Sequence, residues 1–179
     1  MSQFEFIAVF VAIIFGLSLT QILSGMIFLA QRRVLTTDHL GWTLFVLYVL
    51  SLNWWTFWPW SENPSWSFGE FFVVLLWATA HYAMASTLYP SRSLESYKFE
   101  DNRKFVAWSF IVAAVLDAVV TATRGDLFAP WYYPIFIGFM IVTTSTGLLT
   151  RNELVHRYIP WFLLGSMGLW SFIVRRFLD

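Results

Sequence analysis

Six long stretches of apolar residues dominate the sequence. An α-helix rises about 1.5 Å per residue, so about 20 apolar residues are needed to cross the roughly 30 Å of hydrocarbon in a bilayer. Each stretch comes close to this length or exceeds it. The sequence therefore predicts an all-α integral membrane protein, a bundle of about six transmembrane helices forming a single transmembrane domain over residues 1–179. The predicted spans cover residues 4–30, 40–60, 68–89, 104–123, 130–150 and 157–174.

The composition agrees with this interpretation and excludes several kinds of protein. Hydrophobic residues make up 58% of the chain and charged residues 12%, whereas a soluble domain carries roughly 25% charged residues. The formal net charge is zero, so there is no basic face to neutralise the phosphates of a nucleic acid. The chain has no Cys, which excludes disulfides, thiolate metal sites and iron–sulfur clusters. We expect no metal, no cofactor and no nucleic-acid partner.

The apolar start of the chain resembles a secretory signal peptide in one respect only. A signal peptide has a basic segment, a short apolar core and a cleavage site of small residues. Here the only charged side chain before the apolar run is Glu5, the run is too long, and Arg32 and Arg33 follow it. We therefore expect a retained first span.

The distribution of Lys and Arg predicts an orientation, because basic residues are enriched in cytoplasmic loops. Connections one, three and five contain eight of these residues, and the opposite side contains three, namely Arg124, Arg175 and Arg176. This excess predicts that the odd-numbered connections are cytoplasmic and that both termini lie outside the cytoplasm. The third connection, residues 91–103, mixes both signs of charge and is predicted to be a solvated loop or a short surface helix.

Aromatic residues gather at the predicted outer face. Tryptophan and tyrosine favour the headgroup level of a bilayer, so an interfacial belt is one explanation. Trp54 and Trp55 fit a belt less well, because they lie up to two turns inside the second span beside Asn53. An aromatic-walled ligand site that opens outward is the alternative. The remaining aromatic residues of this face are Phe57, Trp58, Trp60, Trp66, Phe68, Phe71, Phe72, Phe128, Trp131, Tyr132 and Tyr133.

The first span contains a ribbon of small residues. Ala8, Ala12, Gly16, Thr20 and Ser24 recur at every fourth position. Membrane helices associate by close approach of their backbones, which small residues permit. The ribbon predicts tight packing of this span, within the bundle or against a second copy of the chain. We favour packing within the bundle, because six helices need such contacts.

The stretch from Phe15 to Gly25 at the end of the first span, together with the pair Trp54-Trp55, resembles a group of small multi-pass bacterial inner-membrane proteins of uncharacterised function. The resemblance covers these two short motifs. It implies a helical membrane fold in the cell inner membrane, and it implies no activity, cofactor or partner.

Two ionisable residues lie deep in the predicted spans, where such groups are costly and often functional. They are Asp117 and His81, and counting along the helices places Asn53 near the depth of Asp117 and Gln21 near the depth of His81. These polar residues have a structural explanation: Asp117 would tie two spans together through Asn53, and His81 would bond to a neighbouring hydroxyl. They also have a functional one, in which a carboxyl and an imidazole at adjacent depths pass protons or bind a cation.

No catalytic motif is present, since the sequence contains neither an HExxH zinc pair nor a GxSxG nucleophile elbow. We therefore expect a protein that is not an enzyme. One hypothesis is a small transporter or channel with a polar pathway around Asp117, His81, Asn53 and Gln21. The other is a non-catalytic accessory, assembly or ligand-sensing protein whose aromatic outer face binds a lipid-like molecule or a partner. The expected partners are membrane lipids and either a second copy of the chain or another membrane protein.

Overall fold

The computed structural model describes residues 2–63, 65–90, 98–128 and 130–174, and this part of the chain is entirely helical apart from its connections. Most of the predicted third connection, residues 91–97, lies outside the described residues, as do Arg175 and Arg176. The elements are α1 (Gln3–Gln31), α2 (Thr37–Phe57), the short 3₁₀ helix η1 (Trp58–Glu62), α3 (Phe68–Leu88), α4 (Phe99–Thr123), α5 (Tyr133–Leu149) and α6 (Glu153–Val174).

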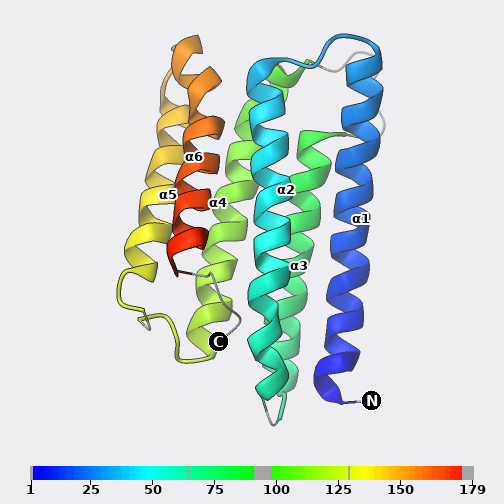
Figure 1. Cartoon of the computed structure of the whole chain (residues 1–179), viewed down its shortest axis with the longest axis vertical. Helices are drawn as coiled ribbons and strands as arrows, with labels where there is room; N and C mark the ends of the chain where they lie inside the picture. The colour runs from blue at the N-terminus through cyan, green and yellow to red at the C-terminus, as the bar shows by residue number, and fades with distance from the viewer. Residues whose placement is uncertain (1, 64, 91–97, 129, 175–179) are drawn as a thin grey trace.

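The six α-helices run up and down side by side (Figure 1). Helix α1 packs mainly on α3, α3 on α4, α2 on α6, and α5 on α4 and α6. The α1–α2 and α5–α6 connections lie at one end of the bundle, which we call the basic end because Arg32, Arg33 and Arg151 lie there. Helix η1 and the α4–α5 connection lie at the other, which we call the aromatic end.

Four of the described helical segments are long and apolar enough to cross a membrane, not six. They are α1, α2 with η1, α3 and α4. Helix α5 has 17 residues, and therefore a length of only roughly 25 Å. Helix α6 is not among the candidate spans, and its first two turns contain Glu153, His156 and Arg157. The prediction of six spans is thus corrected to six helices with four candidate spans.

Of the ribbon of small residues on α1, only Ala8 packs against the core of the bundle, so the expected packing of the whole ribbon within the bundle is wrong. The buried face of α1 instead consists of Ile7, Val11, Phe15, Ser18, Ile22, Gly25 and Leu29. These residues are alternately three and four positions apart for most of the helix, so large side chains fill the contact with α3. Ala12, Gly16, Thr20 and Ser24 are exposed. Two small residues, Ser18 and Gly25, do belong to the buried face, and a Cβ at Gly25 would overlap the Tyr89 ring.

An ion-pair cluster joins three helices at the basic end. Arg103 of α4 lies between Asp38 of α2, 2.8 Å away, and Glu153 of α6, also 2.8 Å away. Asp38 is only 6% exposed. The segment 91–103 was predicted to be a solvated loop or a short surface helix. This prediction is wrong for Arg103, whose side chain is only 14% exposed.

Aromatic and polar contacts close the same end further. The His39 ring stacks on Phe99 with 4.4 Å between ring centroids. Its Nε2 atom lies 3.1 Å from the Leu88 carbonyl. The Tyr89 hydroxyl lies 2.7 Å from that of Thr43, and the Gln21 amide donates to the Tyr89 carbonyl. Among the described residues, Tyr89 and side chains from α1, α2 and α4 therefore make close contacts across the basic end.

Candidate functional site

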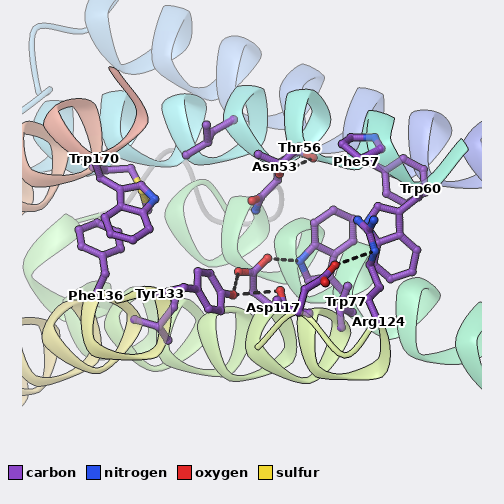
Figure 2. A pocket seen from close by; sticks show the side chains of 17 residues that line it. Asn53, Thr56, Phe57, Trp60, Trp77, Asp117, Arg124, Tyr133, Phe136 and Trp170 are labelled. Atoms are coloured by element: carbon purple, nitrogen blue, oxygen red, sulfur yellow. Dashed lines mark hydrogen bonds and ion pairs between the residues drawn. The ribbon is translucent and has the colours of Figure 1, made fainter. Parts of the chain in front are cut away.

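A cavity of about 280 Å³ lies inside the aromatic end, between α2, α3, α4, α5 and α6 (Figure 2). Its wall combines several aromatic side chains with a small set of polar side chains. The lining residues used below are Asn53, Phe57, Trp60, Trp77, Asp117, Thr121, Arg124, Asp126, Tyr133, Phe136 and Trp170.

Helix α4 presents three polar residues to this cavity. Asp117, Thr121 and Arg124 are four and three positions apart, and this spacing places them on one face of a helix. Asp117 lies six residues before the end of α4, or about 9 Å along the helix. The carboxyl is thus within a candidate membrane span, and the cavity connects its surroundings to the aromatic end.

Two donors from other helices hold the Asp117 carboxyl. Trp77 of α3 donates its indole N–H to Oδ1 at 3.1 Å, and Tyr133 of α5 donates its hydroxyl to Oδ2 at 2.6 Å (Figure 2). The Tyr133 oxygen also lies 3.1 Å from the Thr121 hydroxyl. Asp117 therefore links α3, α4 and α5, and does not link α2 and α4 through Asn53 as the structural explanation proposed.

A second group of charges stands at the mouth of the cavity. The Arg124 guanidinium lies over the Trp60 ring, 4.9 Å from its centroid. It also pairs with Asp126 at 3.4 Å. Both partners are partly exposed, so this ion pair is screened and contributes little to stability. Asp126 nevertheless provides a counter-charge for Arg124 at the mouth of the cavity.

His81 lies deeper and is 1% exposed. Its Nδ1 atom is 2.8 Å from the Trp77 carbonyl, and a carbonyl oxygen only accepts, so Nδ1 carries a hydrogen. Its Nε2 atom is 2.6 Å from Nδ2 of Asn53. A neutral imidazole accepts this amide hydrogen at Nε2; a charged imidazole would require the Asn53 amide to turn its oxygen toward the ring. A flip of the Asn53 amide therefore allows this hydrogen bond to form with either the neutral or the charged imidazole of His81.

A smaller cavity of about 30 Å³ is lined by the His81–Asn53 pair and by Asp117. Asn53 and Asp117 line both this space and the larger cavity, and His81 lines the smaller one. The structure thus brings together three of the four residues expected in a polar pathway. Gln21 is not among them, since it bonds to Tyr89 at the basic end. Gln21 follows Phe15, whose ring contacts His81, by six positions on α1, or about 9 Å. The depth predicted for Gln21 by counting was therefore wrong, and no described residue of α1 lines the cavity.

Trp54 and Trp55 do not line this cavity, although they precede η1 by one turn. They are 46% and 45% exposed. Trp54 borders a shallow apolar groove between α1 and α2, beside Phe15 and Gly16. An aromatic-walled cavity is therefore present at the predicted end, but Trp60, Trp77 and Trp170 form its walls.

The sequence held a signal for the missed residues. Trp77 precedes His81 by four positions, so the two share a helical face. Thr121 and Arg124 follow Asp117 by four and seven positions, which also places them on one helical face. Tyr133 belongs to the aromatic cluster that enters α5, but its contact with Asp117 depends on the turn before α5, for which the sequence has no comparable pattern.

Comparison of the chain with protein-family models, with curated proteins and with solved structures finds no match in any of the three. The comparisons name no family, so the resemblance to small inner-membrane proteins stays a prediction.

Proposed function

We propose that this chain is a small membrane transporter whose solute-binding site is the cavity at the aromatic end. The observation that carries the proposal is the position of Asp117, an ionisable group within a candidate span that lines a cavity. Ionisable groups at such depth usually mark pathways of ions or substrates. The His81–Asn53 pair extends the polar lining further inward.

The two ends of the bundle differ in a way that suits a transporter. The aromatic end contains the cavity, while the Asp38–Arg103–Glu153 cluster and the stacked His39 ring pack the basic end shut. A site open toward one side and closed toward the other is one state of an alternating-access cycle. An always-open channel is not supported by this arrangement.

Proton movement tests the role of Asp117. In proteoliposomes containing the pH dye pyranine, Asp117→Asn should slow proton movement roughly tenfold or more, because an amide cannot take up a proton at that position. Asp101→Asn is the matched control, since Asp101 is exposed and lies on the same helix at the basic end. Equal rates of proton movement for Asp117→Asn and the unmodified protein would rule out Asp117 as a group that takes up and releases protons during transport.

We further propose that the basic end faces the cytoplasm of a cell bounded by an inner membrane, so that the cavity opens outward. The support is the excess of Lys and Arg at that end. Because the chain has no Cys, a single cysteine introduced at Ser61 of η1 should react with a membrane-impermeant maleimide in intact cells, whereas one at Thr150 should not. The reverse labelling pattern would invert the orientation.

A second candidate is a ligand-sensing accessory protein. The ion pairs that close the basic end favour it, because they join α2, α4 and α6 in one fixed arrangement. Such a protein would bind a ligand in the same cavity without moving it. Ligand binding to the purified protein, combined with no transport of any tested ion, would support this candidate over the first.

A further inference from the structure

The wall of the cavity contains more acidic than basic side chains. Among the residues that the structure describes around it, the acidic and basic ones are Asp117, Arg124 and Asp126. Arg124 is balanced by Asp126 and lies on the Trp60 ring. The described partners of Asp117 are the neutral donors of Trp77 and Tyr133. Apart from an electrostatic interaction with His81, the Asp117 carboxyl therefore has no basic side chain beside it in the described wall of the cavity, and a positively charged ligand would supply one.

The rest of the wall suits an organic cation better than a metal ion. Trp60, Trp77 and Trp170 line the cavity together with Phe57 and Phe136. Aromatic faces attract ammonium and guanidinium groups, whereas Ca²⁺ and Mg²⁺ take six or more oxygen ligands. The Arg124 guanidinium already lies 4.9 Å from the centroid of one of these rings. No group of three or more His, Cys, Asp or Glu side chains that could hold a metal occurs among the described residues.

The volume limits the size of the ligand. Ligand cavities typically measure about 300–1,000 Å³, and this one, at about 280 Å³, is at the small end. We propose that the cavity binds a small organic ammonium ion, with its charged group beside Asp117 and its alkyl groups against the tryptophan and phenylalanine rings. This inference rests on the proposed role of the cavity as the solute site.

Three probes of nearly the same shape test the proposal on the unmodified protein. They are choline chloride, the uncharged 3,3-dimethyl-1-butanol and the anionic 3,3-dimethylbutanoate. Isothermal titration of the full chain in detergent should give the tightest binding for choline. The neutral alcohol should bind roughly tenfold more weakly, because it loses both the charge-assisted contact and the cation–π attraction. Equal binding of the alcohol, or displacement of choline by an equal concentration of NaCl, would overturn the proposal.

Variants locate the site. Asp117→Asn should remove most of the preference for choline over the alcohol, while Asp101→Asn should retain it. Unchanged preference in a folded Asp117→Asn protein, checked by circular dichroism, would overturn the assignment to this cavity. If that variant fails to fold, Trp77→Phe serves instead: it keeps the charge and the ring but removes the N–H that holds the carboxyl, and it should weaken choline binding several-fold.

The same probe separates this inference from the proposed function. Choline binding without choline uptake into proteoliposomes would contradict transport and leave the ligand class standing. Proton movement that depends on Asp117 without choline binding would contradict the ligand class and leave transport standing.

Discussion

Replacing Arg103 with methionine should lower the free energy of unfolding by about 3–5 kcal/mol, the cost of leaving a buried charge without its partner. Arg103 donates to Oδ2 of Asp38 through Nε at 2.9 Å and contacts the same oxygen through a terminal nitrogen at 2.8 Å. Asp38 is 6% exposed, so little water reaches it to replace the guanidinium, and its remaining hydrogen bonds from Thr36 and His39 carry no positive charge from Arg or Lys. Thermal unfolding in detergent micelles, followed by circular dichroism, measures the change.

The other carboxylate of the cluster is the matched control. Glu153 also lies 2.8 Å from Arg103, but its side chain is 72% exposed. Glu153→Gln should therefore change stability by no more than about 0.5 kcal/mol, as is typical of an exposed ion pair. The double variant Arg103→Met, Asp38→Leu should recover most of the loss, because it removes both buried charges. Equal effects of Arg103→Met and Glu153→Gln would mean that Asp38 is solvated.

The helical fold and its order could be predicted from the sequence, because apolar run length is a strong signal. The number of spans could not. The length of the apolar run predicted one span over residues 130–150. Helix α5 begins only at Tyr133 and has 17 residues, so its length of roughly 25 Å is less than the roughly 30 Å of hydrocarbon in a bilayer. Helix α6 begins at Glu153, four residues before the predicted start of the span at 157, so the prediction left the charge of Glu153 outside the helix.

The buried faces of the helices were harder to predict than the helices themselves. In lipid both faces of a helix are apolar, so hydrophobic periodicity does not distinguish the packed face. The small residues of α1 were the most visible pattern, and they turned out to be exposed at Ala12 and Gly16. The packed face contains Phe15 and Ile22, which look no different from lipid-facing residues in the sequence.

Polar residues at depth were a more reliable guide to the site than aromatic residues. Asp117 and Asn53 line both cavities and His81 lines the smaller one, since each needs a partner that lipid cannot provide. Gln21 is the exception, because it bonds to Tyr89 at the basic end. Trp54 needs no such partner and lies half-exposed beside α1. The pairing was not predictable, because it depends on which way each helix is turned.

Replacing His81 with alanine should cost about 3–5 kcal/mol of stability, because it empties a buried volume and leaves the Asn53 amide without its partner. His81 is 1% exposed and bonds to the Trp77 carbonyl and the Asn53 amide. Asn53→Ala alone should cost less, about 1–3 kcal/mol. In a double-mutant cycle the two changes should couple by about 1 kcal/mol or more, because they share one hydrogen bond. His156→Ala, at the start of α6, is the control.

His81→Gln separates the structural role of this residue from a functional one. A glutamine amide can donate to the Trp77 carbonyl and accept from Asn53, so it should restore much of the stability lost in His81→Ala. It cannot take up a proton near neutral pH, whereas an imidazole can. If the His81–Asn53 pair relays protons, proton movement in proteoliposomes should fall roughly tenfold in a folded His81→Gln protein. If movement is unchanged, His81 serves packing alone, and the proton pathway ends at Asp117.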